Sequence, residues 1–174
     1  ASAGTSIIKD DLIPIDLRMG LEITLPYMGT ARLDLSGGTE IPAIRPPVIR
    51  PSNLQVKDLS LTGAEVALII NVENPNRFDV TVNSMSGNLL VGDREWGVAG
   101  AENGAWLPAG TDVAMVLYTR VNFSEVGRSA WSLLTGSGNT DVSLQGDMDI
   151  DMDLEAFDGG GIPWDADAKV SIIR

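Results

Sequence analysis

The chain has 174 residues, of which 44% are hydrophobic, so it is long enough to bury one large core or two smaller ones. Its 24 acidic and 12 basic residues give a net charge of -12, which repels nucleic-acid phosphates and argues against nucleic acid as a partner. The sequence contains neither Cys nor His, which excludes disulfides, thiolate and imidazole metal sites, cysteine nucleophiles and histidine-dependent catalytic triads.

Near the N-terminus, apolar and polar residues alternate strictly from residue 15 to residue 25, where every odd position is Ile, Leu or Met. This period of two predicts a strand with one buried face. Pro26 to Gly29 has the composition of a turn, and the alternation resumes over residues 31–35 until Gly37 and Gly38 follow. The pattern therefore predicts an N-terminal β-hairpin.

A proline-rich segment follows the predicted hairpin. Residues 42–51 contain Pro42, Pro46, Pro47 and Pro51. Their fixed φ and missing N–H groups favour an extended segment without ladder hydrogen bonds. We therefore place a domain boundary here, with a hairpin unit over residues 1–45 and a β domain over residues 46–174.

Beyond this boundary, short alternating segments recur up to the C-terminus. They predict strands within residues 54–61, 66–73, 78–82, 85–91, 96–99, 111–121, 142–154 and 168–172. The segment 66–73 has apolar residues on both faces, which is typical of a central strand. One short helix is predicted within residues 124–135, because Val126, Ala130 and Leu134 recur at helical spacing behind Ser124 as the N-cap.

The two ends of the chain share a pattern. The strand that ends at Leu25 and the return segment 31–35 resemble the strand that ends at Leu154 and the return segment 168–172. Two interpretations stay open. Residues 12–36 are the tail half of a repeat whose first half lies upstream of Ala1, or two amphipathic hairpins merely look alike.

Four aspartates, Asp147, Asp149, Asp151 and Asp153, share one face of the predicted strand at 142–154. They are a weak candidate for cation binding. Neighbouring carboxylates on one strand face lie about 7 Å apart, so they can attract Ca²⁺ only with low affinity. The spacing does not match an EF-hand loop, which needs Gly at position 6 and Glu at position 12. We favour a solvated strand face whose charge also discourages edge-to-edge pairing, and we predict no metal site.

The middle of the chain carries a family resemblance. Residues 66–73 are followed by Asn74, Pro75 and Asn76 and then by Phe78, and this order resembles the signature of the water stress and hypersensitive response (WHy) domain. That domain belongs to the group-2 late-embryogenesis-abundant family, here in its bacterial or archaeal type. The resemblance continues through Gly92, the turn at residues 108–110 and the segment 142–146, and it covers residues 48–174.

The resemblance implies both a fold and a role for the signature. The fold is an all-β, antiparallel β-sandwich, similar to fibronectin type III and immunoglobulin domains, with one short helix and the N-terminal β-hairpin in addition. Within the family, the signature residues Asn74, Pro75, Asn76 and Phe78 are a structural feature at a strand end. The turn chemistry of Pro and Asn agrees with that role.

The resemblance further implies a non-enzymatic protein that protects against desiccation, without catalytic residues or a cofactor. Its partners would be other proteins or membrane components. The alternatives are a structural or interaction subunit that docks a partner, an exported lipoprotein, or a lipid-binding module with an apolar cleft between its sheets. Export to the periplasm or outer membrane is favoured, and a lipid anchor would need a Cys upstream of Ala1. No apolar run approaches the roughly 20 residues of a spanning helix, so we expect no transmembrane segment in this sequence.

Overall fold

The computed structural model describes residues 12–25, 29–136, 138–152 and 159–173. The chain divides into two compact units, Ala1–Arg45 and Pro46–Arg174. In the first unit, β1 (Leu12–Leu25) and β2 (Gly29–Pro42) form an antiparallel two-stranded sheet. Their register is continuous, from Leu12 opposite Pro42 to Leu25 opposite Gly29. Both strands are longer than the sequence pattern predicted, and β2 runs into the proline-rich segment.

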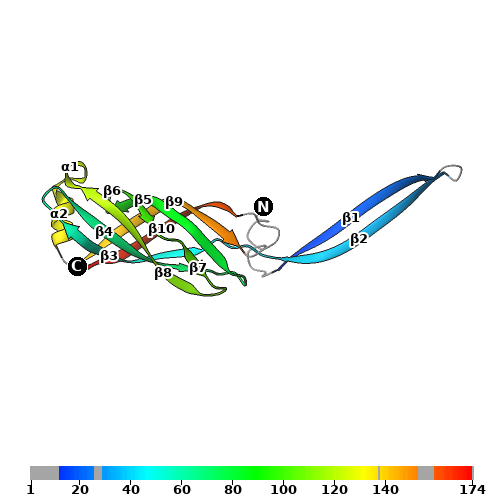
Figure 1. The fold of residues 1–174 in the computed structure, drawn as a ribbon, viewed down its shortest axis with the longest axis horizontal. Coiled ribbons are helices and arrows are strands. Elements are labelled where there is room, and N and C mark those ends of the chain that lie inside the picture. Colours follow the sequence, from blue (N-terminus) through cyan, green and yellow to red (C-terminus); the bar gives the residue numbers. More distant parts are fainter. Residues whose placement is uncertain (1–11, 26–28, 137, 153–158, 174) are drawn as a thin grey trace. The chain divides into compact units, whose positions relative to one another are not determined.

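The described residues of the second unit form eight strands and two short helices (Figure 1). In chain order these elements are β3 (Val48–Leu59), β4 (Gly63–Glu73), β5 (Val80–Val91), β6 (Arg94–Ala101), β7 (Ala105–Leu107), β8 (Asp112–Asn122), α1 (Phe123–Val126), α2 (Arg128–Thr135), β9 (Asn139–Met152) and β10 (Gly160–Ile173). Strand β4 lies between β3 and β8, so the prediction that this segment is a central strand is confirmed.

Seven strands of the second unit close into one barrel. Their order is β6, β8, β4, β3, β10, β9 and β5, and β5 pairs in turn with β6. Strand β7 pairs with β5 outside this ring. The sheet is mixed, because residues 171–173 of β10 run parallel to residues 53–55 of β3. The predicted antiparallel β-sandwich is therefore wrong, although the all-β class is right.

Closure depends on two short pairings and on irregular strands. Strand β6 reaches β8 only through Gly100 opposite Tyr118 and Ala101 opposite Leu117, and β3 meets β10 over three residue pairs. Register shifts interrupt β3 at Pro51, β3 again at Val56, and β5 at Val82. Such bulges bend a strand and increase its twist, which lets a sheet curve back on itself.

The core of the second unit lies inside the barrel. Alternate residues of the ring strands point inward, and ten large side chains on them are fully buried: Leu54, Val66, Leu68, Ile70, Val72, Leu89, Leu117, Leu144, Met148 and Ile150. Leu107 of β7 and Leu134 of α2 are fully buried against the same core. A barrel of so few strands has an interior just wide enough for its own side chains to fill. The alternation that the sequence analysis read as strands is thus the alternation between core and solvent.

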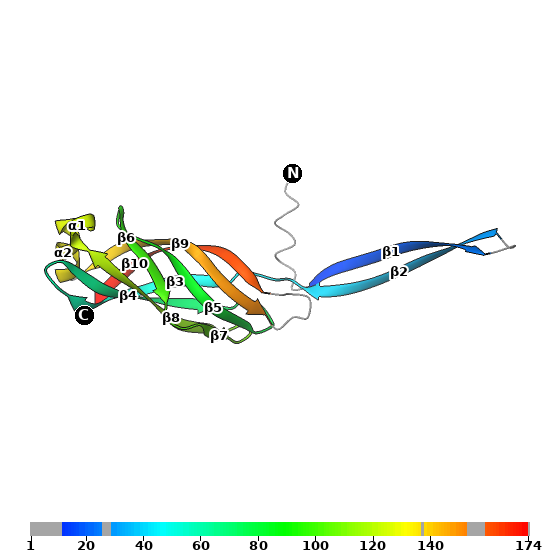
Figure 2. The ribbon, with the colours of Figure 1, turned by 45° about the horizontal axis from the view of Figure 1, so that its top comes forward.

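Two helices lie at one end of the barrel, the end at which β10 finishes (Figure 2). Asn122, rather than the predicted Ser124, is the N-cap of α1, because its Oδ1 accepts a hydrogen bond from the Ser124 amide at 3.1 Å. The prediction of one continuous helix is also wrong. Gly127 has a φ of 88°, which ends α1 before α2 begins. Within the described residues, neither helix is long and apolar enough to cross a bilayer.

Candidate functional site

The signature residue Asn74 is fully buried at the C-terminal side of β4. Its Nδ2 donates to the carbonyl oxygens of Phe78 at 2.8 Å, Leu107 at 3.0 Å and Pro108 at 3.3 Å. Its Oδ1 accepts from the backbone amide and from the Nδ2 of Asn76, both at 3.0 Å. One side chain therefore holds its own turn together and ties it to a segment more than 30 residues further along the chain.

Backbone hydrogen bonds reinforce this connection between the β4–β5 turn and the β7–β8 turn. The Asn74 amide donates to the Thr111 carbonyl at 2.8 Å, and the Gly110 amide donates to the Asn76 carbonyl at 3.0 Å. The Asp79 carboxylate accepts from the Ala109 amide at 2.9 Å. Both polar atoms of the Asn74 side chain are therefore engaged by the protein, as expected for a residue with a structural role. We name this site the Asn74 clamp, comprising residues 74–79 and 107–111.

The aspartate row lies on the outer face of β9. Asp147, Asp149 and Asp151 are exposed and alternate with the buried residues Met148 and Ile150. Asp153, the fourth member of the predicted row, is outside the described residues. Neighbouring carboxylates of one strand point in the same direction, about 7 Å apart, and do not converge on one centre.

The neighbours of the row across the sheet are neutral. On β5, Ser86 lies opposite Asp147, Ser84 opposite Asp149 and Thr81 opposite Asp151. On β10, Pro163 lies opposite Asp147 and Gly161 opposite Asp149. Among the residues that the structure describes, no group of three or more acidic side chains could hold a metal ion. The prediction that the row is a solvated strand face without a metal ion stays a prediction.

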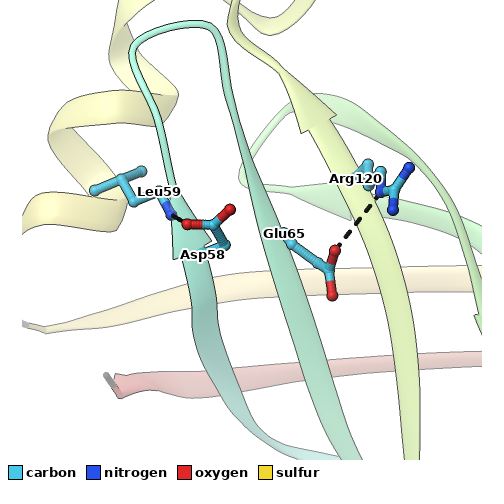
Figure 3. A network of polar contacts seen from close by, with 4 residues as sticks. All are labelled: Asp58, Leu59, Glu65 and Arg120. Atoms are coloured by element: carbon cyan, nitrogen blue, oxygen red, sulfur yellow. Dashed lines mark hydrogen bonds and ion pairs between the residues drawn. The ribbon is translucent and has the colours of Figure 1, made fainter.

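An open, polar groove of about 440 Å³, which no sequence motif predicted, lies beside the β3–β4 turn. Figure 3 shows its charged groups: Glu65 on β4 points toward Arg120 on β8, with 3.6 Å between Oε2 and Nε, and Asp58 accepts from the Leu59 amide at 2.8 Å. The hydroxyl of Ser60 donates to the Gly63 carbonyl at 2.9 Å. These polar groups bind one another, so the groove is a stabilised turn rather than a set of poised catalytic groups.

The family model described as late embryogenesis abundant protein matches residues 70–158. This segment starts just before the Asn74 clamp and includes the described part of the aspartate row. The chain belongs to the late embryogenesis abundant (LEA) family. The resemblance proposed from the signature residues is therefore confirmed at the level of the family, which is generally non-enzymatic and related to stress.

One of two similar solved structures supports the fold of this LEA protein. The solution structure of AT1g01470 from Arabidopsis thaliana is 19% identical, with a TM-score of 0.52 over 77% of this chain and 87% of that chain. A crystal structure of a protein from Archaeoglobus fulgidus is 9% identical, with a TM-score of 0.38 over 73% of this chain and 97% of that chain. No curated protein matches the chain significantly.

Both ends of the clamp in this LEA protein are recognisable in the sequence as turns, but the contact between them is not. The tripeptide at residues 74–76 and the turn at residues 108–110 were both identified as turns. Nothing in their local chemistry indicates that Asn74 Nδ2 donates to Leu107 and Pro108, because that contact depends on how β7 and β8 are placed around the barrel. The only local signal is Asn at a strand end, where its amide can bond nearby backbone.

Proposed function

We propose that this LEA protein is a non-enzymatic protective protein of the WHy type, which acts through the hydrated acidic surface of its barrel. The observation that carries the proposal is the charge of that unit. Residues 46–174 contain 18 Asp and Glu but only 8 Lys and Arg. A net charge far from zero keeps a folded protein soluble and separate from other acidic proteins as its concentration rises.

The outer face of β9 and β10 is the clearest part of this surface. Asp147, Asp149 and Asp151 on β9 and Asp165 and Asp167 on β10 are all exposed. The register offsets the two sets, since Asp165 lies opposite Gln145 and Asp167 lies opposite Ser143. Like charges directly opposite one another destabilise a sheet, so this offset lets the barrel carry many carboxylates without repulsion inside a cross-strand pair.

The proposed action is physical. The apolar side chains fill the barrel, while its outer face presents carboxylates and hydroxyls that bind water. When water is withdrawn, such molecules placed between other proteins keep the apolar surfaces of those proteins apart. Protection of this kind needs no specific partner, and it depends on net charge rather than on one binding site.

A drying assay tests this proposal. A dehydration-sensitive enzyme is dried and rehydrated with the LEA protein, and its recovered activity is compared with that obtained with an equal mass of a neutral globular protein. Replacing Asp147, Asp149 and Asp151 together by Asn removes three charges, whereas replacing the same residues by Glu keeps them. We expect the Asn variant to protect less well and the Glu variant to protect as well as the parent chain.

Two results would contradict the proposal. If the parent chain protects no better than the neutral protein, the protective function is wrong. If the parent protects but the Asn variant protects equally well, the protective function stands and the role of the carboxylates is wrong. Melting curves of both variants identify any effect that comes from loss of folding.

The fold argues against the lipid-binding alternative but does not bear on export or on a lipid anchor. The lipid-binding alternative relied on a cleft between two sheets, but the second unit has one closed sheet with its core side chains inside. Export and a lipid anchor stay predictions. The interaction-subunit alternative rests on a different observation, the exposed apolar face of the N-terminal hairpin.

A further inference from the structure

The hairpin formed by β1 and β2 has one apolar and one polar face. Leu17, Met19 and Leu21 of β1 and Leu35 of β2 share the apolar face and are 61%, 48%, 40% and 43% exposed. With Gly37 opposite Leu17, this face forms an open groove of about 350 Å³. A contiguous apolar face of this kind marks an interaction site.

The opposite face of the hairpin suits water. It carries Asp16, Arg18, Glu22, Arg32 and Asp34. Glu22 lies opposite Arg32, and Arg32 Nε lies 3.6 Å from Asp34 Oδ1. An isolated two-stranded hairpin is at best marginally stable in water, so a pair of 14-residue strands with one apolar face needs a cover on that face only.

The second unit contains a hairpin of the same kind with its cover in place. Strands β9 and β10 are also 14 residues each and antiparallel. In both hairpins a glycine begins the second strand opposite an apolar residue of the first, Gly29 opposite Leu25 and Gly160 opposite Ile150. In both first strands, every second residue before this pair lies on the same face as its apolar member. On β1 these residues are Ile, Leu or Met, and on β9 they include Val142, Leu144 and Met148, which are buried, as is Ile150.

The barrel also shows where the cover comes from in the chain. The apolar face of β9 and β10 packs on strands β3 to β8, and all of these strands precede β9 in the sequence. Residues 46–138 supply this cover. If β1 and β2 correspond to β9 and β10, their cover likewise precedes them in the chain.

We propose that β1 and β2 are the last hairpin of a second barrel of the LEA type, whose other strands lie in the same polypeptide on the N-terminal side of this sequence. The apolar face of the hairpin is the inner wall of that barrel, and its charged face is the outer wall. The two units of the chain are then parts of two consecutive barrels. This inference concerns domain organisation and does not depend on the protective function.

Single cysteines test the proposal, because residues 1–174 contain no Cys of their own and any Cys of the extended polypeptide is first replaced by Ser. Leu17→Cys places a thiol on the apolar face, and Arg18→Cys places one on the polar face one residue away. Asp149→Cys on the outer face of β9 is the exposed control in the barrel. The rate of reaction with a maleimide is measured in residues 1–174 and in the polypeptide extended by its natural N-terminal sequence.

We expect Leu17→Cys and Arg18→Cys to react at similar rates in residues 1–174. In the extended polypeptide, Leu17→Cys should react on the order of 100-fold more slowly, as expected for a residue exposed only by local opening, while Arg18→Cys and Asp149→Cys stay fast. Hydrogen exchange of the unmodified extended polypeptide checks the result without a substitution. The amides of residues 12–25 should be protected to the same extent as those of β9.

Three results would overturn the proposal. The first is equal reactivity of Leu17→Cys and Arg18→Cys in the extended polypeptide, together with fast exchange of residues 12–25. The second is a natural chain that begins at or near residue 1. The third is protection of Leu17→Cys in residues 1–174 that grows with protein concentration and yields disulfide-linked dimers, which would assign the apolar face to a second copy of the chain.

Discussion

Substitution of Asn74 by Ala should remove more stability than a typical turn residue supplies. The side chain is fully buried, donates to three carbonyls and accepts two hydrogen bonds from Asn76. A typical hydrogen bond contributes about 1 kcal/mol net, and a buried group left without its partner costs about 1–3 kcal/mol. Because water can reach part of the site after truncation, we expect a loss of about 3–4 kcal/mol in the free energy of unfolding. Domain stabilities are only about 5–15 kcal/mol, so this is a large fraction.

Urea unfolding followed by tryptophan fluorescence measures this loss, since the chain has four Trp residues. Asn74→Asp keeps the shape and the acceptors but places a carboxylate against three carbonyl oxygens, and it should lower stability at least as much as Asn74→Ala. Asn88→Ala, at an exposed position of β5, is the matched control and should stay within about 0.5 kcal/mol of the parent. A loss below about 1 kcal/mol for Asn74→Ala, accompanied by lost protection in the drying assay, would refute a structural role for the clamp.

Three further substitutions probe the barrel. A Cβ at Gly146 would lie 2.0 Å from the Ser86 carbonyl oxygen, so Gly146→Ala should cost at least about 2 kcal/mol, whereas Gly161→Ala, with no atom within 4 Å, should be nearly neutral in thermal unfolding. Arg120→Ala should change stability by less than about 1 kcal/mol, because the Arg120 side chain is 89% exposed and its pair with Glu65 is screened by water; a larger loss in urea unfolding would mean that the groove is structurally important. Calorimetric titration of metal-free protein with Ca²⁺ should show no one-to-one binding of micromolar affinity, and such binding, abolished by Asp149→Ala, would overturn the solvated-face interpretation of the aspartate row.

The sequence pattern predicted where strands lie far better than which strands are neighbours. Alternation over residues 66–73 and 142–154 identifies the buried face of β4 and β9, because side chains of a strand point to opposite faces in turn. It says nothing about the parallel contact of residues 53–55 with residues 171–173, which turns an open sheet into a closed barrel. A β-sandwich and a closed barrel require the same alternation of apolar and polar residues. The sandwich was therefore predicted from the family resemblance alone, and that prediction was wrong.

The turns of the Asn74 clamp could be predicted from the sequence, but the contact between them could not. Asn74 and Asn76 could be identified as turn residues, since Asn side chains bond nearby backbone and Pro75 cannot donate to a ladder. The partners of Asn74 at residues 107 and 108 follow from tertiary placement and leave no local trace. The helix prediction failed for a local reason instead, because Asn122 competes with Ser124 as the N-cap and Gly127 interrupts the helical spacing.

Gly146 is required by the packing of neighbouring strands, and the local sequence does not indicate this. In the sequence, Gly146 is an isolated glycine within a long strand, a position that favours a bend. In the barrel it lies opposite Gly87 of β5 on one side and opposite Trp164 of β10 on the other. A Cβ at Gly87 would lie 3.0 Å from the Trp164 ring, so each missing side chain makes room for backbone or for the indole. The two glycines therefore let three strands approach closely enough for Trp164 to be buried at 7% exposure, and their role is clearance within the core rather than flexibility of the strand.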